Sequence, residues 1–410
     1  MQYVIIGNSA AAIGAVEGIR LIDKEGEILI IASEPYHTYS RPLISYFLGG
    51  KADEKKMHYR DEGFYERNRC KTMLGTTVLA IDAKKKTVQI EDGKKISYDK
   101  LLLATGSSPL IPPLPGLEEV KDCFTFLTYD NAKALKKALT PDKRVLILGA
   151  GLIGLKCAEG IGKNAASITC VDRAAQILPS ILDAEGAALA QSQLEEEGIR
   201  FCLGQEITAL KGNSAALSGG ETLEFDILVI AVGCKPNLEL FKNAGGTVDR
   251  GILIDENGAT SIKDVFAAGD CAQGYDLIAS CQRVLALLPN GYMQGEAAGI
   301  KMAGAAKPFQ KGMAMNAIGL FGCHILSAGV YEGETHRSKE EVVYKRLFTK
   351  DNRLKGFILI NQPERAGIYT SLIREQVPLD TLDFEMILER PQLMAFSARE
   401  RAKKLGGATI

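Results

Sequence analysis

The residues whose spacing is most specific for chemistry are three glycines near the middle of the chain. Gly149, Gly151 and Gly154 follow an apolar run in the string RVLILGAGLIGL. In a G-x-G-x-x-G turn, the first glycine permits the turn, the second lets the backbone approach a pyrophosphate, and the third lets the helix pack on its strand. The N-terminus of that helix attracts the phosphates. The spacing therefore predicts a dinucleotide-binding site.

A carboxylate stands where such a site reads the ribose. Asp172 ends the next apolar strand in the string ASITCVDR. A carboxylate at this position accepts hydrogen bonds from the free ribose hydroxyls of NAD and repels the 2′-phosphate of NADP. In the alternative interpretation, the neighbouring Arg173 pairs with that phosphate. We expect NAD(H) rather than NADP(H).

A weaker version of the pattern opens the chain. Gly7 follows the run YVII, but Ser9 and Ala12 stand where the second and third glycines are expected. Small side chains still permit a close backbone approach, although an incomplete fingerprint is a weak signal. Glu34 ends the next strand at the spacing of a ribose-binding acid. The pattern predicts a second dinucleotide site, and a strand, helix and strand without a ligand are the alternative.

Three further strings run from a strand into a glycine turn. LLLATGSSP and DILVIAVGCKPN each carry the chain between two domains, and VFAAGD delivers Asp270 after Gly269. A carboxylate there binds a polyol hydroxyl, whereas an ordinary turn aspartate is the alternative. Two dinucleotide folds in tandem suggest one nicotinamide and one flavin cofactor.

Length and composition limit the remaining possibilities. A chain of 410 residues is long for one hydrophobic core, so we expect two or three domains. A net charge of -1 argues against a nucleic acid partner. The apolar strand at the N-terminus leaves no room for a signal peptide, and no apolar run reaches the roughly 18 to 20 residues that span a bilayer. We expect a cytoplasmic protein without a membrane span.

The cysteines indicate no metal or disulfide chemistry. The nine cysteines form no CxxC pair, which argues against structural zinc, iron–sulfur ligation and thioredoxin-type chemistry. We expect most of them to be buried thiols in a reducing compartment. We therefore predict no metal site.

Taken together, these strings resemble the two-dinucleotide flavoprotein superfamily related to glutathione reductase, over essentially all of the chain. Within it, the chain is similar to NADH:rubredoxin oxidoreductases and to the flavin region of nitrite reductase large subunits. The resemblance rests on GNSAAAIGA, EPYHTYSRPLIS, LLLATG, GAGLIGL, AVGCKPN, VFAAGD and ERAGIY.

The resemblance implies an α/β protein with two Rossmann-like domains and an α+β C-terminal domain. FAD is bound by a discontinuous domain, residues 1–110 and 243–306, and NAD(H) by residues 111–242, with the C-terminal domain at 307–410. The implied FAD-binding residues are Gly7, Ser9, Ala10, Ala12, Glu34, Arg41, Pro42, Ala104, Thr105, Gly106, Gly269, Asp270, Pro289 and Asn290. The implied NAD-binding residues are Gly149, Gly151, Ile153, Gly154, Asp172, Arg173 and Gly233.

Two of the implied FAD contacts have specific interpretations. Arg41 contacts the FAD phosphates or the pyrimidine edge, and a surface arginine stiffened by Pro42 is the alternative. The string LLPNGYMQGEAAGIKMAG predicts a helix with Pro289 and Asn290 at its start. By resemblance, the positive end of that helix faces the flavin pyrimidine, where it stabilises the anionic reduced flavin; plain packing is the alternative.

The chain departs from its disulfide-reducing relatives in the segment after Glu34. That segment reads YHTYSRPLISYFLGG and contains no cysteine, so no thiol there relays hydride to a disulfide or forms a sulfenic acid. Electrons therefore leave from the flavin itself. FAD converts a hydride into single electrons, which favours a rubredoxin, a ferredoxin or a metal cluster in a partner subunit as acceptor.

A second departure concerns Lys156, which stands where many relatives have a glutamate near the nicotinamide. A cation there disfavours NAD⁺ relative to NADH, and Glu159 one turn later forms an i,i+3 pair with it. A solvated helix lysine is the alternative. Tyr46 takes a position where several related reductases have lysine, and we assign it no catalytic role.

The end of the chain offers fewer signals. VVYKRLFT and RLKGFILI predict an antiparallel sheet, and QLMAFSARERAKKL predicts a helix. A basic cluster near the C-terminus either steers an acidic carrier or is a solvated helix end; it consists of Arg399, Arg401, Lys403 and Lys404. The four histidines remain unassigned: His37, His58, His324 and His336.

The predicted function is that of an NADH oxidoreductase, with FAD and NAD(H) as cofactors, that passes electrons to a redox protein. Two alternatives stay open. The chain is a flavin subunit of a larger complex of the nitrite reductase or tungsten/molybdenum aldehyde oxidoreductase type, or a nucleotide-controlled interaction protein without enzymatic activity. A homodimer and a hetero-complex are both compatible with the sequence.

Overall fold

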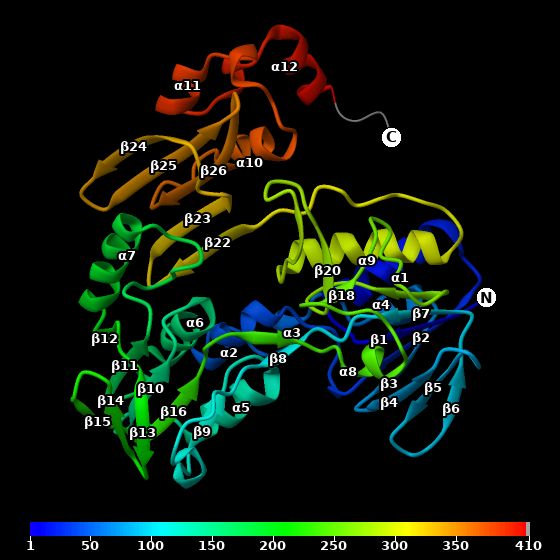
Figure 1. Ribbon diagram of the computed structural model, residues 1–410, viewed down its shortest axis with the longest axis horizontal. Coiled ribbons are helices and arrows are strands. Elements are labelled where there is room, and N and C mark those ends of the chain that lie inside the picture. The colour runs from blue at the N-terminus through cyan, green and yellow to red at the C-terminus, as the bar shows by residue number, and fades with distance from the viewer. Residues whose placement is uncertain (407–410) are drawn as a thin grey trace. The chain divides into compact units, whose positions relative to one another are not determined.

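The computed structural model describes residues 1–406, without the side chains of Lys403 and Lys404. The predicted C-terminal basic cluster therefore lies partly outside the described residues. The chain forms two compact units, shown in Figure 1. The first comprises Met1–Ala175, Arg200–Asp276 and Ser280–Gly312, and the second comprises Gln176–Ile199, Leu277–Ala279 and the described chain from Met313 onward.

The first unit contains two parallel sheets built in the same way. The first sheet has the order β19-β7-β1-β2-β3, with parallel neighbours throughout. Its strands are β1 (Gln2–Ile6), β2 (Glu27–Ala32), β3 (Cys70–Leu74), β7 (Lys100–Leu103) and β19 (Val265–Ala267). Residues Tyr3–Ile6 pair in register with both β2 and β7, so β1 lies at the centre.

Two helices bury one face of this sheet, α1 (Ala10–Ile22) and α9 (Leu288–Met302). Their backbones touch, because a Cβ placed on any of four glycines would lie 2.0–2.3 Å from a carbonyl oxygen of the opposite helix. The four are Gly14, Gly18, Gly295 and Gly299. The glycine and alanine run of the predicted helix at 287–304 therefore has a packing function.

The opposite face packs on a small antiparallel sheet and one short helix. These elements are β4 (Val78–Asp82), β5 (Thr87–Ile90), β6 (Lys95–Ser97) and α8 (Glu239–Asn243). The segment after β2 forms short helices instead of strands: η1 (Arg41–Leu43), α2 (Ile44–Leu48), α3 (Glu54–Met57) and α4 (Phe64–Arg67). A further three-stranded sheet precedes α9 and consists of β18 (Ile252–Leu253), β20 (Ala272–Asp276) and β21 (Cys281–Val284).

The second parallel sheet has the order β12-β11-β10-β16-β9. Its strands are β9 (Cys123–Thr125), β10 (Arg144–Leu148), β11 (Ser167–Asp172), β12 (Ile199–Leu203) and β16 (Ile227–Ile230). Two helices accompany it, α5 (Tyr129–Ala138) and α6 (Leu152–Ile161), with the turns η2 (Leu117–Glu119) and η3 (Gly162–Asn164). A small sheet completes its core with β13 (Ile207–Lys211), β14 (Ser214–Leu217) and β15 (Thr222–Glu224).

Two short antiparallel strands join these halves of the first unit. They are β8 (Ser107–Pro109) and β17 (Cys234–Pro236), which lie at the ends of the two strings that we expected to carry the chain between domains. The predicted pair of Rossmann-like sheets is thus confirmed. The exact domain boundaries given above stay a prediction.

The second unit contains a five-stranded antiparallel sheet, which confirms the expected sheet near the C-terminus. Its strands, in spatial order, are β22 (Met315–Leu320), β23 (Cys323–Gly329), β26 (Arg353–Ile360), β25 (Val343–Lys350) and β24 (Glu334–Glu340). Its helices and turns are α7 (Ala184–Glu196), α10 (Ala366–Arg374), η4 (Leu379–Thr381), α11 (Phe384–Glu389), η5 (Leu393–Ala395) and α12 (Ala398–Leu405).

Two features of the second unit differ from expectation. The predicted helix over QLMAFSARERAKKL begins only at Ala398, because Ser397 caps it by accepting a hydrogen bond from the Glu400 amide (3.3 Å). In addition, Asp183 before α7 accepts hydrogen bonds from Tyr344 (2.7 Å) and Arg346 (2.7 Å) of β25, so α7 packs on this sheet. None of the described helices is long and apolar enough to cross a membrane.

Candidate functional site

The turn between β1 and α1 has the geometry of a phosphate-binding turn. Gly7 has a φ of +117°, and a Cβ there would lie 2.1 Å from the carbonyl oxygen of Ala104. Ser9 precedes α1, whose N-terminal amides receive no side-chain cap from the described residues. Ala10 and Ala12 are buried under the turn. The first-turn N–H groups of α1 are therefore available to a phosphate.

The predicted FAD segments converge for a topological reason. Gly7 follows β1, Glu34 follows β2, Ala104 follows β7 and the turn at Gly269 follows β19. These strands are parallel neighbours, so their carboxyl ends meet at one edge of the sheet. Ligands of open α/β sheets bind at this edge.

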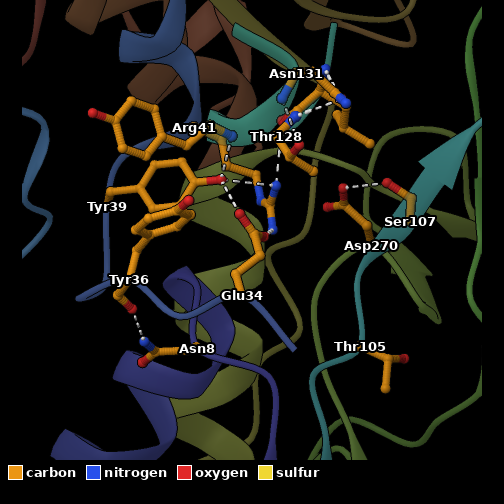
Figure 2. A network of polar contacts seen from close by, with 12 residues as sticks. Asn8, Glu34, Tyr36, Tyr39, Arg41, Thr105, Ser107, Thr128, Asn131 and Asp270 are labelled. Carbon is orange, nitrogen blue, oxygen red and sulfur yellow. Dashed lines mark hydrogen bonds and ion pairs between the residues drawn. The ribbon is translucent and has the colours of Figure 1, made fainter. Parts of the chain in front are cut away.

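Glu34 is oriented by two side chains from the segment after β2, as Figure 2 shows. Tyr39 donates to one carboxylate oxygen (2.6 Å) and Arg41 to the other (2.5 Å). A carboxylate has about four lone-pair sites, so each oxygen keeps one for a ribose hydroxyl. The geometry fits the predicted ribose-binding role. The direct partners of Arg41 here are Glu34, Tyr39 and the Leu127 carbonyl, while Pro42 is exposed beside it.

Asp270 carries the clearest electrostatic signal of this site. Ser107 donates a hydrogen bond to its carboxylate across 3.0 Å (Figure 2). Burial raises the pKa of Asp270, although the Ser107 hydrogen bond and the charge of Arg41 oppose this shift. A desolvated carboxylate that forms no ion pair with the described residues gains from additional hydroxyl donors. This fits a polyol-binding acid better than an ordinary turn aspartate.

Hydrogen bonds connect the two segments that carry the chain between the parallel sheets, LLLATGSSP and DILVIAVGCKPN. Thr105 donates to the Asn237 carbonyl (3.1 Å), and the Asn237 side-chain amide donates to the Thr105 carbonyl (2.8 Å). The Asn237 backbone amide also donates to the Gly106 carbonyl (3.0 Å). These bonds hold the turn at residues 104–106 against the turn at residues 233–237. Gly233 lies in the second turn with a φ of +116° and is exposed.

The N-terminus of α9 lies against the same edge of the sheet. Pro289 occupies the first turn of the helix and Asn290 is buried. Gln294, one turn on, accepts a hydrogen bond from the Gly269 amide (2.9 Å). The positive end of the α9 dipole therefore lies beside the turn that carries Asp270.

The second glycine turn repeats the geometry of the first. Gly149 has a φ of +116°, and its amide donates to the Val171 carbonyl (2.8 Å), as Gly7 donates to Ile31 (2.8 Å). A Cβ on Gly154 would lie 2.0 Å from the Gly149 oxygen, whereas a Cβ on Gly151 would meet open space. The geometry of the three glycines fits the roles that the fingerprint predicts, which are turn, open approach and helix packing. Ile153 is half-buried in the first turn of α6.

Asp172 is tied to this turn by backbone hydrogen bonds. Its carboxylate accepts from the amides of Ala150 (2.7 Å) and Ala174 (2.8 Å), one on each oxygen. The remaining lone pairs suit two ribose hydroxyls. Arg173 is exposed. The arrangement matches the NAD-type interpretation of the sequence.

The family follows from a comparison of the sequence with protein-family models. The Pyridine nucleotide-disulphide oxidoreductase model matches residues 1–295. The chain belongs to this family. The predicted superfamily, the oxidoreductase class and the cofactors FAD and NAD(H) are thereby confirmed.

Two relatives resemble the chain over nearly its full length. The epsilon subunit of NADH-dependent phenylglyoxylate dehydrogenase from Aromatoleum evansii is 31% identical over 394 residues, which is 93% of each chain. A rubredoxin-NAD(+) reductase from Pseudomonas putida is 29% identical, covering 90% of this chain and 97% of the relative. A solved structure of the covalent putidaredoxin reductase–putidaredoxin complex shares the fold with a TM-score of 0.88, 22% identity and 99% coverage of both chains.

Most cysteine thiols of the chain are buried, as expected for residues that pack in a hydrophobic core. All nine cysteines are free, and five of them are buried: Cys157, Cys170, Cys202, Cys271 and Cys323. Burial raises the pKa of the Cys157, Cys170 and Cys271 thiols. A buried thiol with a raised pKa is a poor nucleophile. Cys234 and Cys281 are exposed.

Several contacts around the family's two nucleotide turns were not predicted. Lys156 forms the expected ion pair with Glu159, but its ammonium also lies 4.8 Å from the centre of the Tyr46 ring. Only 18% of the Lys156 side chain is exposed, so it is not the solvated lysine of the alternative interpretation. The rings of His37 and His58 lie 4.6 Å apart, and burial lowers the pKa of His37. Spacing offers no signal for these pairs, because their members come from distant positions.

Proposed function

We propose that the protein takes hydride from NADH through FAD and passes electrons to a one-electron carrier. The observation that carries this proposal is the repeat of one glycine turn, at Gly7 and Gly149, within one compact unit. Each turn lies near a carboxylate at the ribose position, Glu34 or Asp172. When bound, FAD accepts a two-electron hydride and returns the electrons singly.

In this proposal the chain itself binds and orients the reactants. The amides at the start of α1 hold the FAD pyrophosphate and Asp270 accepts a polyol hydroxyl. The amides at the start of α6 hold the NADH pyrophosphate, and Asp172 favours NADH over NADPH by charge repulsion. We assign the FAD domain to residues 1–110 and 243–306, the NAD(H) domain to 111–242 and the C-terminal domain to 307–410.

A small redox protein is the acceptor that we favour. The segment 36–50 contains no cysteine, so the chain has no thiol there to take the electrons. The rubredoxin-NAD(+) reductase relative supports a rubredoxin, and the putidaredoxin reductase fold supports the same kind of partner. FAD can return its electrons singly, which suits a carrier that accepts one electron at a time.

A second candidate is a role as the flavin subunit of a larger complex. The Aromatoleum evansii relative is named as a subunit, and the similarity spans 93% of both chains. In this case the acceptor is a metal cluster held by a partner chain. The oxidoreductase family membership argues against the interaction protein without activity. We place the protein in the cytoplasm, where NADH and both kinds of acceptor occur.

Anaerobic stopped-flow reduction tests the main proposal. The purified flavoprotein is mixed with NADH or NADPH while flavin absorbance is followed, and the reduced protein is then mixed with rubredoxin or ferredoxin. We expect rapid bleaching by NADH, slower bleaching by NADPH and rapid reoxidation by a carrier. Absence of bleaching by either nucleotide would refute hydride transfer.

The Asp172→Ser variant sharpens this test. The change removes one carboxylate and its two proposed ribose contacts. We therefore expect half-saturation at about tenfold higher NADH concentration, and a smaller difference between the rates of flavin reduction by NADH and NADPH. The matched control is Asp226→Ser, which removes an acidic side chain that pairs with Arg144 at the start of β10.

Bleaching without reoxidation by either carrier favours the complex subunit, and purification from the native source with metal analysis then identifies its partner.

A further inference from the structure

Two of the four unassigned histidines, His37 and His58, stack on each other in the first unit. Their ring centres lie 4.6 Å apart, and the Tyr65 ring of α4 lies 4.8 Å from the His37 ring. The segments that carry them pair as a short antiparallel bridge, in which the Ser40 amide donates to the Met57 carbonyl (2.8 Å). The contact between the rings thus joins the chain after β2 to the chain after α3.

Hydrogen bonds connect this bridge to the turn between β1 and α1. The Tyr65 hydroxyl accepts from the Thr38 amide (3.0 Å) and donates to the side-chain oxygen of Asn8 (2.9 Å). The Asn8 side-chain amide donates to the Tyr36 carbonyl (3.2 Å), as Figure 2 shows. Asn8 belongs to the glycine turn that precedes α1, and both ends of its amide group are held by neighbours of His37. The conformation of that turn therefore depends on how the His37 segment is packed.

The His37 ring is packed in its neutral form. Its Nδ1 lies 3.2 Å from the Thr38 carbonyl oxygen, which can only accept, so Nδ1 carries the hydrogen. Its Nε2 is buried and has no hydrogen-bond partner among the described residues. A proton on Nε2 would therefore place a buried N–H without an acceptor, and a positive charge, beside the His58 ring.

The surroundings of His37 disfavour its protonated form. Burial lowers the pKa of His37, and the adjacent His58 adds to this effect, while a backbone hydrogen bond opposes it. The charges of Asp61 and Glu62 also oppose it, but both side chains are largely exposed and each pairs with a basic side chain. A histidine whose pKa is lowered on folding contributes stability that is present above about pH 6.5 and is lost as the pH falls below that value.

We propose that His37 and His58 form an acid-sensitive switch, in which protonation of His37 loosens the bridge and weakens the binding of FAD at the turn before α1. The bridge also carries Tyr39, the hydrogen-bond donor of Glu34, so its loosening affects this carboxylate together with Asn8. Histidine is the side chain whose charge changes in this range of pH. This inference rests on the proposed function, which assigns FAD to that turn, and adds a regulatory property to it.

Titration of the flavin-free full chain with FAD at pH 7.5, 6.5 and 5.5, at constant ionic strength, tests this inference. Flavin fluorescence reports the dissociation constant. We expect the wild-type dissociation constant to rise on acidification by about three- to tenfold more than that of His37→Phe, which keeps an aromatic ring but takes up no proton. Both proteins carry every other titrating group, Asp270 included, so their difference reports the effect of His37.

The second unit offers a matched control. His336 of β24 is also half-buried and also packs on an aromatic ring, that of Phe384, with the ring centres 5.3 Å apart. His336→Phe should keep the wild-type dependence on pH. Tyr65→Phe keeps the ring against His37 but removes the hydroxyl that contacts Asn8, so it should bind FAD more weakly at pH 7.5 and show a smaller dependence on pH.

The outcomes separate this inference from the proposed function. Equal pH dependence in the wild type and in His37→Phe overturns the switch, as does the same loss of dependence in His336→Phe. Tighter FAD binding by the wild type at low pH, which a direct contact between a charged His37 and a phosphate would produce, also overturns it. If His37→Phe fails to fold, Tyr65→Phe decides the matter in the same way. A wild type that shows the switch but is not reduced by NADH contradicts the proposed function instead.

Discussion

Ser107 donates a hydrogen bond to Asp270 across 3.0 Å and so joins the start of β8 to the turn that follows β19. Burial raises the pKa of this carboxyl group against the opposing effects of Ser107 and Arg41. A group whose pKa is raised on folding destabilises the folded protein at pH values above its usual range, because its ionised form is disfavoured there. The site therefore contains a carboxylate that costs stability until hydroxyl groups of a ligand solvate it.

Asp270→Asn should consequently separate stability from cofactor binding. At pH 7 we expect the flavin-free variant to unfold at a higher temperature than the flavin-free wild type, and to bind FAD at least about tenfold more weakly. Differential scanning fluorimetry and fluorescence titration with FAD measure the two effects. Ser107→Ala is the control, since it removes a donor, raises the pKa of Asp270 further and lowers the stability of the flavin-free protein. A destabilised Asp270→Asn variant with normal FAD affinity would contradict this account.

The ion pairs of Asp264 should make the stability of the first unit sensitive to acid. Lys100 (2.5 Å) and Lys86 (2.6 Å) both contact its carboxylate and lower its pKa to about 2. A lowered pKa contributes stability that is complete above the usual aspartate range and disappears as the pH falls from about 4 to about 2. Asp264→Asn should therefore lose about 1–2 kcal/mol of unfolding free energy at pH 7, and less at pH 3.

Urea unfolding at pH 7, 4 and 3 checks this dependence. Asparagine suits the backbone at this position, because Asp264 has a φ of +65° and asparagine tolerates the left-handed region. Lys71→Met, which removes a largely exposed ion pair with Glu27, serves as the control and should change stability by less than about 1 kcal/mol at every pH. Equal losses for Asp264→Asn at pH 7 and pH 3 would show that charge is not the cause.

Substitution by alanine should have different effects at Gly7 and at Gly151. Gly7→Ala places a Cβ 2.1 Å from the Ala104 oxygen in a strained backbone region, so we expect loss of at least about 2 kcal/mol of stability and of bound flavin. Gly151→Ala meets open space, so the variant should fold and retain FAD while saturating with NADH less readily. The ratio of flavin to protein absorbance and the melting temperature distinguish them. Normal flavin content in Gly7→Ala would contradict the assignment of the first turn.

The exposed thiols should be dispensable. Cys234 and Cys281 are the exposed cysteines of the chain, and neither belongs to the segment 36–50. We expect Cys234→Ser with Cys281→Ser to leave the rate of flavin reduction by NADH within about twofold of the wild type, since serine preserves size and polarity. Stopped-flow measurement before and after treatment with iodoacetamide provides the comparison. A large loss of rate in the serine variant would indicate thiol chemistry.

The parts of this architecture that could be predicted from the sequence are local. The apolar run before Gly149 and the carboxylate at Asp172 could be predicted from short stretches of sequence, and so could the helix with Pro289 in its first turn. The contacts of Tyr46 with Lys156 and of Ser107 with Asp270 join segments more than 100 positions apart, so no spacing rule reports them. The packing of α7 on β25 through Asp183 was missed for the same reason, because its sequence neighbours belong to a parallel sheet. Tertiary contacts of this kind depend on topology, which local patterns do not encode.

The contact between α1 and α9 has a consequence for the synthesis of the protein. Helix α1 can pack on α9 only after the ribosome has made nearly the whole first unit, since α1 ends at Ile22 and α9 begins at Leu288. The strands of the second sheet are contiguous by comparison and come within reach of one another earlier. Contacts of such long sequence separation form slowly and leave apolar surface uncovered in the meantime. We therefore expect nascent chains shorter than about 300 residues to expose the apolar face of α1 and to depend on chaperones that cover it.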